Sequence, residues 1–257
     1  MIVESFNDIV FGDVQKMVEE KYANDVNYIN AVIVLGYQIA PFTYAQYKSK
    51  HPRERVIVYQ MEQMYKGSKW LNRHTLDWLK QADEVWDYDL ENIQMLSMYG
   101  IKAQYKPMVY TNSLKYNLQP VEKDIDVLFY GCLTNRRVML LQAWTSMSMF
   151  HATTFMATGL TGQKLVDYIN RSKVVLNLHA YNGVNRQEQA RIFMPVINGA
   201  CVVSERSVRN EFGTAIVETD SKNINVTVKN LLKTGDWAKI GVDAPEIYRR
   251  LCEARNY

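Results

Sequence analysis

Two arginines follow a glycine-ended apolar run in the second half of the chain. The run DVLFYG spans Asp126 to Gly131, and Arg136 and Arg137 come a few residues later, where a helix is expected to start. A glycine lets the backbone approach a phosphate, and a helix N-terminus favours anions. The two arginines could add charge-assisted contacts to a diphosphate. The alternative is a turn glycine followed by two solvated arginines.

A second polar group lies in the segment NRQEQARIFMPVINGACVVSE, residues 185–205. On a helix over 185–197, Glu188 and Arg191 are three residues apart and share a face. Arg191 could reach a phosphate, while Glu188 or Glu205 could accept hydrogen bonds from vicinal hydroxyl groups. The alternative is an exposed ion pair within an ordinary helix.

His179 and Tyr181 follow the apolar run KVVLNL, residues 173–178. The carboxyl end of a parallel strand faces the ligand site of an open α/β sheet. His179 is therefore a candidate catalytic residue, and Tyr181 is expected in a loop over the ligand. The alternative for His179 is a structural histidine with satisfied hydrogen bonds.

Two carboxylates in the first half stand at the ends of apolar runs. Glu62 follows the run 56–61, and Asp87 follows the run 84–86. At the carboxyl edge of a sheet, either could act as a general base. Glu62 is the better candidate, because Asp87 could instead cap the turn that follows it.

Basic and aromatic residues are interleaved between Gly36 and Lys80. Eight basic and three acidic residues give this stretch a net charge of +5, compared with +3 for the whole chain of 257 residues. Such a surface suits a polyanion, nucleic acid first, because aromatic rings can stack on exposed bases. The alternative is a solvated basic face. The candidate binding residues are Tyr44, Tyr47, Lys48, Lys50, Arg53 and Arg55.

The elements that must position these groups alternate between short apolar runs and amphipathic stretches. Such alternation predicts an α/β fold, with parallel sheets covered by helices. We expect strands at 31–36, 56–61, 84–86, 103–106, 125–130, 152–155, 173–178, 201–204 and 215–218. We expect helices at 75–81, 91–99, 136–144, 162–170, 185–197, 223–232 and from 236 toward 254. The polar segment 113–123 is expected to link two Rossmann-like domains, 1–112 and 124–257, that face a cleft.

Taken together, these strings resemble GT-B glycosyltransferases of bacterial and viral type. In the second half the resemblance is carried by Arg191-Ile-Phe193, by GACVVSE at 199–205 and by Glu211-Phe212-Gly213, with DVLFYG and the two arginines upstream. In the first half it is carried by VYQMEQ at 58–63, by Trp70 and by ADEVWDY at 82–88 with Asn92. The similarity spans residues 31 to about 250.

The resemblance implies transfer of a sugar from a nucleotide donor, UDP-sugar first, to a hydroxyl acceptor. It implies that the second domain binds the donor. Gly131, Arg136, Arg137 and Arg191 would lie at the diphosphate, Tyr181 over the sugar, and Glu188 or Glu205 at the ribose. The candidate catalytic residues are Glu62, Asp87 and His179.

The acceptor side is expected to be the first domain. The basic stretch favours DNA with a hydroxymethylated pyrimidine, which resembles the acceptor of some phage DNA glycosyltransferases. A glycan or a lipid-linked saccharide is the alternative acceptor.

The sequence departs from the family pattern at two positions. Met194 stands where a glutamate is usual beside R-x-F, and Val196 stands eight residues after Glu188, so the E-x7-E pair of many retaining enzymes is absent. Inversion and retention of the anomeric configuration both stay open. A module that binds a nucleotide or nucleic acid without catalysis is a further alternative.

Composition and motifs bound the remaining possibilities. The chain is 47% hydrophobic and 22% charged, as in ordinary globular proteins. Its three cysteines are far apart in the sequence, and no signal peptide or bilayer-spanning run is recognised, so we expect a cytoplasmic protein, in the host cytoplasm if a phage encodes it. Asp124 and Asp126 have D-x-D spacing but open an expected strand. We therefore expect no metal and no cofactor besides the sugar donor, and the oligomeric state is not predicted.

Overall fold

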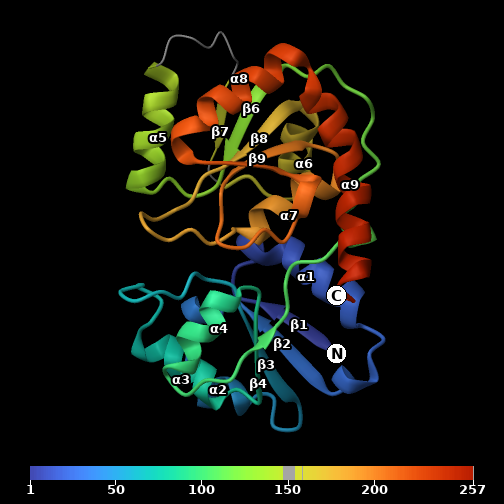
Figure 1. The fold of residues 1–257 in the computed structure, drawn as a ribbon. Helices are drawn as coiled ribbons and strands as arrows, with labels where there is room; N and C mark the ends of the chain where they lie inside the picture. Colours follow the sequence, from blue (N-terminus) through green and yellow to red (C-terminus); the bar gives the residue numbers. More distant parts are fainter. Residues whose placement is uncertain (147–153, 158, 257) are drawn as a thin grey trace. The chain divides into compact units, whose positions relative to one another are not determined.

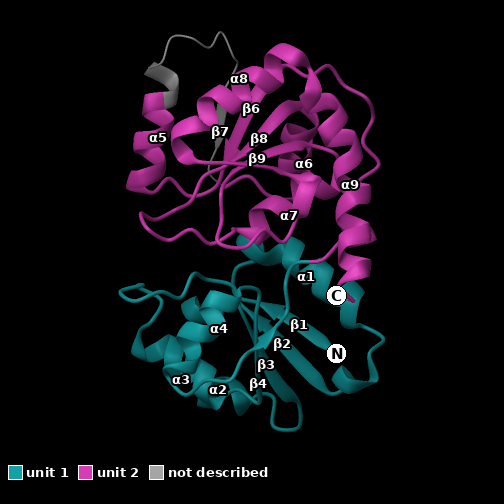
Figure 2. Ribbon diagram, in the orientation of Figure 1, with its two compact units in different colours: residues 1–108 teal, residues 109–257 magenta. Residues whose placement is uncertain are grey.

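The computed structural model describes residues 1–146, 154–157 and 159–256 (Figure 1). The chain forms two compact units, residues 1–108 and 109–257 (Figure 2). The segment 113–123, expected as a linker, belongs to unit 2. Asn198 fixes part of it there, donating from Nδ2 to the carbonyl of Leu114 at 2.9 Å and accepting at Oδ1 from the backbone N–H of Tyr116 at 3.0 Å.

Unit 1 is a five-stranded sheet in the order β1-β2-β3-β4-β5, and each pair of neighbouring strands is parallel. The strands are β1 Ile2–Ser5, β2 Ala31–Leu35, β3 Arg55–Gln60, β4 Glu84–Asp87 and β5 Gln104–Tyr105. The helices are α1 Asp8–Tyr22, α2 Tyr44–Lys48, α3 Arg73–Gln81 and α4 Leu90–Ser97, with short 3₁₀ turns at Val26–Tyr28 and Tyr37–Ile39.

The core of unit 1 lies on both faces of this sheet. All five residues of β2 and the last five of β3 are buried, as expected for inner parallel strands. Alternate valines of β2 and β3 pack with Trp78 of α3 and Tyr47 of α2. On the opposite face Trp86 of β4 contacts Tyr22 at the end of α1, with ring centroids 4.8 Å apart. The carboxyl ends of β2, β3 and β4 are thereby held in fixed positions.

Unit 2 is also a parallel sheet of five strands, in the order β10-β9-β8-β6-β7. The strands are β6 Ile125–Tyr130, β7 Thr154–Ala157, β8 Ser172–Asn177, β9 Cys201–Glu205 and β10 Val217–Thr219. The helices are α5 Asn135–Ser146, α6 Gly162–Arg171, α7 Gln189–Ile197, α8 Ile224–Thr234 and α9 Asp236–Ala254. Shorter 3₁₀ turns lie at Asn112–Leu114, Gly213–Ala215 and Ser221–Asn223.

The strand order of unit 2 reverses between β6 and β8. From β6 the chain goes to β7 on one side, and then to β8, β9 and β10 in turn on the other side. Leu141 of α5 and Val228 of α8 pack on one face with alternate residues of β6, β8 and β9, while α6, α7 and α9 all contact β8. Such a reversal opens a crevice outside the carboxyl ends of the two central strands, where open α/β sheets bind ligands.

The sequence predicted the α/β class and most of these elements, and the structure corrects two details. β1, α1 and α2 were not anticipated. Residues 152 and 153 of the expected strand 152–155 lie outside the described residues. The helix expected from Asn185 begins at Gln189, because the preceding segment bonds to another loop: the carbonyl of Asn185 accepts from Val208 N at 2.8 Å, and Gln187 Oε1 accepts from Glu211 N at 2.8 Å.

Candidate functional site

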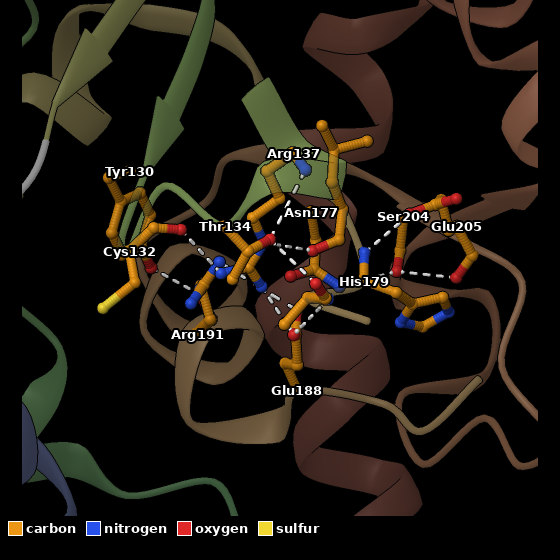
Figure 3. A network of polar contacts seen from close by, with 12 residues as sticks. Tyr130, Cys132, Thr134, Arg137, Asn177, His179, Glu188, Arg191, Ser204 and Glu205 are labelled. Carbon is orange, nitrogen blue, oxygen red and sulfur yellow. Dashed lines mark hydrogen bonds and ion pairs between the residues drawn. The ribbon is translucent and has the colours of Figure 1, made fainter. Parts of the chain in front are cut away.

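A network of charged side chains occupies the carboxyl ends of β6, β8 and β9 in unit 2 (Figure 3). It joins the loop after β6, the loop after β8 and the last residue of β9. Thr134 links the first two loops, because its hydroxyl donates to the carbonyl of Ala180 at 2.8 Å. The same oxygen accepts from Arg137 N at 3.4 Å, which caps the start of α5. The network therefore sits at the strand-order reversal.

Arg136 and Glu205 form a bidentate pair across this edge. Nη2 and Nη1 of Arg136 lie 2.5 and 2.7 Å from the two carboxylate oxygens of Glu205. Nη1 also donates to the carbonyl of His179 at 2.9 Å, and the N–H of His179 donates to Glu205 at 2.6 Å. Glu205 is 2% exposed, and both its oxygens are engaged. The expectation that Glu205 binds a ribose is corrected here, since this carboxylate positions Arg136 and the loop after β8.

Arg137 is the second buried arginine and is paired with Glu188. It donates to the carbonyls of Leu178 and Cys132, each at 2.9 Å, and Nη2 donates to Glu188 Oε1 at 2.5 Å. Arg137 is only 1% exposed, so it is not the solvated arginine that the sequence allowed as an alternative. Burial lowers the pKa of its guanidinium group. A buried charge of this kind is stable only when it is paired. Arg137 therefore fixes Glu188 and two loop carbonyls.

Arg191 occupies the space that Gly131 leaves open. Gly131 has φ +118°, and a Cβ atom built on it would lie 2.7 Å from Cζ and Nη2 of Arg191. Only glycine adopts this backbone conformation readily and also leaves room for the guanidinium. Arg191 is in the first turn of α7, and its backbone carbonyl accepts from the hydroxyl of Tyr130. The glycine and the arginine that the sequence assigned to one site are thus in contact.

Two complementary atoms in this network lack hydrogen-bond partners. Nη1 of Arg191 and Oε2 of Glu188 are both buried and make no hydrogen bond among the described residues, although they form an ion pair with each other. They lie 4.0 Å apart, which is too long for a direct hydrogen bond. The two side chains are 18% and 12% exposed. A ligand that offers both an anionic oxygen and a hydroxyl group could satisfy the two atoms together.

His179 and Tyr181 follow β8, as the sequence predicted. The His179 ring is 2% exposed, and its Nε2 lies 3.1 Å from the carbonyl of Arg206, while Nδ1 is buried without a partner. A ring buried in this way cannot reach an attacking hydroxyl, so the catalytic assignment of His179 is corrected to a structural one. Tyr181 lies in the loop between β8 and α7, and its role over the sugar stays a prediction.

Glu62 lies just beyond β3, at the carboxyl edge of unit 1, and it is half-buried. Burial raises the pKa of its carboxyl group, while Gln38, Lys69 and Trp70 act in the opposite direction. Nε2 of Gln38 donates to Oε1 at 3.2 Å. A partly accessible carboxylate with a raised pKa suits a general base, so Glu62 stays the catalytic candidate.

Asp87 ends β4 and is fully buried. Its carboxyl group accepts from Asp89 N at 2.8 Å, from Asn92 Nδ2 at 3.0 Å and from Gln60 Nε2 at 3.3 Å. Burial raises its pKa well above the ordinary value. The side chain caps the following turn, so the catalytic assignment of Asp87 is corrected.

The structure also corrects the basic and aromatic surface. Tyr44 and Tyr47 are 5% and 1% exposed and belong to the core of unit 1, so neither can stack on a base. Lys48 donates to Asp83 at 3.0 Å and to the carbonyl of Glu54 at 2.6 Å. Both partners directly precede a strand, so Lys48 lies at the amino edge of the sheet, opposite Glu62.

The other three basic residues of that surface lie on the same segment. Arg55 is the first residue of β3 and contacts Glu84, the first residue of β4, at 3.5 Å. Arg53 is exposed just before it. Lys50 is exposed and its Nζ lies 4.9 Å from the ring centre of Phe42. The segment 48–55 is therefore not at the carboxyl edge where the acceptor was expected.

Sequence reasoning missed three amide side chains near Glu62. Gln60 and Asn92 hold the backbone of the loop after β3, and Gln38 bonds the carboxylate itself. Gln60 and Asn92 are fully buried and Gln38 is 8% exposed. A signal existed for Gln60, which precedes Glu62 at the end of an apolar run. Nothing in the sequence distinguishes Gln38 from an exposed polar residue after a strand.

Two expectations about absent features concern only the described residues. Within residues 1–146, 154–157 and 159–256, no cluster of three or more histidine, cysteine, aspartate or glutamate side chains could hold a metal ion. Asp124 and Asp126 instead pair with Arg171 and Lys173 at the amino end of β6. Over the same residues, no helix is both long enough and apolar enough to cross a bilayer.

Comparison with solved structures places the fold among glycosyltransferases. A sucrose-phosphate synthase from Thermosynechococcus elongatus is similar with a TM-score of 0.56 at 12% identity, covering 95% of this chain and 74% of that one. An α-glucosyltransferase in complex with UDP and a 13-mer DNA containing an HMU base has a TM-score of 0.58 at 10% identity, covering 86% and 75%. The Anabaena protein Alr3699/HepE in complex with UDP and glucose also has a TM-score of 0.58 at 10% identity, covering 88% and 77%.

At these identities the similarity establishes the fold, which is the GT-B fold expected from the sequence. No protein-family model matches the sequence, and no curated protein matches it.

Proposed function

We propose that the protein is a glycosyltransferase that uses a nucleotide-sugar donor, UDP-sugar first, and that the charged network of unit 2 binds the donor. The observation that carries this proposal is the pair of unsatisfied atoms, Arg191 Nη1 and Glu188 Oε2, at the strand-order reversal. A diphosphate supplies the acceptor that Arg191 lacks, and a ribose or sugar hydroxyl supplies the donor that Glu188 lacks. The α-glucosyltransferase and Alr3699/HepE, two similar solved structures that contain UDP, support the choice of nucleotide.

Charge supports the same assignment. The network contains three arginines and two glutamates, and one of those arginines is left without a full complement of acceptors. Binding of a diphosphate would add the missing negative charge in a partly buried site, where charge-assisted hydrogen bonds are strong. The same arginine would stabilise the nucleotide as it leaves, without requiring a metal ion.

The reaction would form one bond and break one bond at the anomeric carbon of the sugar. The acceptor oxygen bonds to this carbon while the bond from the carbon to the terminal phosphate oxygen breaks, and the nucleoside diphosphate leaves with that electron pair. On an inverting route Glu62 takes the proton of the acceptor hydroxyl. On a retaining route the leaving phosphate can take it. The absence of E-x7-E leaves both routes open.

Hydrolysis of nucleotide sugars without an acceptor tests this function directly, because transferases often lose sugar to water. A panel of UDP-, GDP-, ADP- and dTDP-sugars would be tested for thermal stabilisation of the protein and for release of the nucleotide. We expect stabilisation and slow release with at least one UDP-sugar. Thermal stabilisation without nucleotide release or sugar transfer would favour a protein that binds nucleotides without catalysis. Met194, which is buried and stands in place of the usual glutamate, is the feature that supports this alternative. No stabilisation by any member of the panel would contradict the proposal.

DNA with a hydroxymethylated pyrimidine is a second candidate for the molecule that accepts the sugar. It is favoured by the similarity to the α-glucosyltransferase that was solved with DNA. The burial of Tyr44 and Tyr47 and the position of Lys48 and Arg55 remove residues 44–55 from the surface on which the sequence based it, while Lys66, Lys69 and Arg73 of the same stretch are exposed. Binding of a duplex at low salt would test this candidate. About four phosphate contacts would give a slope of roughly −3.6 in log K against log salt.

A further inference from the structure

A polar cluster at the carboxyl edge of unit 1 differs from the donor network. It consists of Gln38, Glu62, Gln63 and Trp70, which we call the amide site. Gln38 lies in the turn after β2, and the other three lie in the loop after β3. Gln38 and Glu62 are joined by a hydrogen bond of 3.2 Å. Two loops that are distant in sequence thus meet at the candidate base.

Two buried oxygens of the amide site lack hydrogen-bond partners among the described residues. They are Oε1 of Gln38 and Oε1 of Gln63, whereas the indole N–H of Trp70 interacts with the carboxylate of Glu62. Gln38 and Gln63 are only 8% and 6% exposed. A buried polar atom without a hydrogen-bond partner destabilises the fold. The two oxygens, on the same two loops as the Glu62 carboxylate, are therefore available to groups that donate hydrogen bonds.

The backbone around the amide site is fixed by hydrogen bonds. Asn92 donates from Nδ2 to the carbonyl of Glu62 at 2.8 Å and accepts at Oδ1 from Met64 N at 2.7 Å. Gln60 Oε1 accepts from Glu62 N at 2.9 Å, and the hydroxyl of Ser68 donates to the carbonyl of Gln63 at 2.9 Å. The unsatisfied atoms therefore lie on a loop whose main chain is already anchored. Such an arrangement suits a binding site better than a collapsed loop, because its geometry is set before a ligand arrives.

We propose that the amide site binds a neutral polyhydroxyl acceptor, a saccharide, through adjacent hydroxyl groups. The inference rests on the proposed glycosyltransferase function and names the class of its acceptor. One hydroxyl can donate to the carboxylate of Glu62, whose Oε1 already accepts from Gln38 Nε2 at 3.2 Å. A neighbouring hydroxyl can donate to Gln38 Oε1. The first hydroxyl is then held where Glu62 can take its proton as the sugar is transferred.

The amide site suits a saccharide better than the phosphates of a nucleic acid. Its one acidic group, Glu62, would repel a phosphate, and its unsatisfied oxygens can only accept hydrogen bonds. One face of the Trp70 ring is covered by the ammonium of Lys69, 4.3 Å from the ring centre, which leaves that face unavailable for stacking on a base. Three exposed basic residues lie in or next to the same loop, Lys66, Lys69 and Arg73, and a DNA acceptor would depend on them.

The test compares two variants with the unmodified protein, after release of nucleotide from a UDP-sugar has been established. Transfer from that donor is measured to a panel of p-nitrophenyl glycosides and to duplex DNA that carries hydroxymethyluracil. Gln38→Leu removes the amide with the unsatisfied oxygen and keeps a similar side-chain volume. We expect this variant to raise the KM for a glycoside acceptor about tenfold, because one hydrogen bond to a partly buried group is lost. Lys66→Gln combined with Arg73→Gln should leave that KM unchanged.

The outcomes separate this inference from the proposed function. Absence of nucleotide release contradicts the function itself. Three results would contradict the saccharide inference alone. They are nucleotide release with transfer only to DNA, nucleotide release without transfer to any glycoside, and an unchanged acceptor KM in Gln38→Leu. A thermal unfolding curve of Gln38→Leu controls for folding. If that variant does not fold, Gln38→Asn keeps the amide, withdraws it by one methylene and is expected to raise the same KM.

Discussion

The carboxyl edges of the two sheets carry different chemistry, although both sheets are parallel and alternate strands with helices. The edge of unit 2 holds Arg136, Arg137 and Arg191, each placed by a carboxylate or by a glycine. The edge of unit 1 holds amides around Glu62, and Asp87 there is fully buried. In the proposed function, the first edge would bind the anionic donor and the second the hydroxyl groups of the acceptor.

The strand order explains why the two edges can differ. In unit 2 the order reverses between β6 and β8, and the carboxyl ends at such a reversal are where open α/β sheets bind ligands. In unit 1 the order follows the sequence from β1 to β5 and has no reversal. The polar groups of unit 1 therefore come from loops that lie over the edge, anchored by Asn92, and not from a crevice within it. We infer that the donor requires the crevice and that the acceptor requires only the loops.

The largest effect is expected from the carboxylate of unit 1. Glu62→Gln keeps the shape of the side chain and removes its charge, so an inverting enzyme would lose a factor of about 10²–10⁴ in kcat. Because burial raises the pKa of Glu62, kcat/KM of the unmodified protein should fall with decreasing pH at a midpoint above the ordinary glutamate value. The variant should lack this acidic limb. A pH–rate profile measures both, and full activity of Glu62→Gln would favour the retaining route.

Arg191→Ala probes the other edge and should lower kcat by about 10²–10³, the effect of losing one group that stabilises developing charge. Arg171→Ala is the matched control. Arg171 is an arginine of the same unit, but it is exposed and pairs with Asp124 at the amino edge of the sheet. Steady-state rates with a UDP-sugar would show the difference. Equal rates in the two variants would remove Arg191 from the donor site.

A smaller effect is expected from Gly131→Ala, which forces Arg191 to move because a Cβ atom would lie 2.7 Å from its guanidinium. We expect the donor KM to rise about tenfold, with a further loss of stability from the positive φ. The combined variant Gly131→Ala with Arg191→Ala should be hardly worse than Arg191→Ala alone, because the glycine acts through the arginine. Additive losses in this double-mutant cycle would show that Gly131 has a separate role.

The sequence predicted much of this comparison, and its failures have physical causes. The strands over 125–130 and 201–204 were identified because buried parallel strands are continuous apolar runs. Gly131 and Arg191, 60 residues apart in the sequence, were assigned to one site because the resemblance to GT-B glycosyltransferases implies that both lie at the diphosphate. The start of α7 was misplaced because Asn185 and Gln187 bond to the loop at 208–211, and such a tertiary contact has no local signal.

The partners of the charged residues could not be predicted from local sequence. Glu205 was assigned to a ribose, but Arg136, 69 residues earlier, uses both its oxygens. The basic and aromatic stretch failed for another reason. Tyr44 and Tyr47 have helical spacing in α2 and face the core, and Lys48 and Arg55 flank the start of β3, so charge and aromatic content alone did not reveal which edge they occupy.

The smallest effect is expected at the amino edge of unit 1. Changing Lys48, Lys50, Arg53 and Arg55 together to glutamine should leave transfer within about twofold of the unmodified protein, because surface charges on the opposite side of the sheet are largely screened from Glu62. The variant should lose only about 0.2–1 kcal/mol of stability, as for other exposed ion pairs.

This loss of stability has a predictable pH dependence. Partial burial acts to raise the pKa of Asp83, but the N–H of Val56 and the ammonium of Lys48 outweigh it, so the net shift is downward. A carboxyl whose folded pKa is lowered stabilises the fold above its unfolded pKa, and this contribution disappears as the pH falls through the folded value. The difference in urea unfolding free energy between the two proteins should therefore be present at pH 7 and shrink in acid. A tenfold or greater loss of transfer at pH 7 would instead return this surface to the acceptor site.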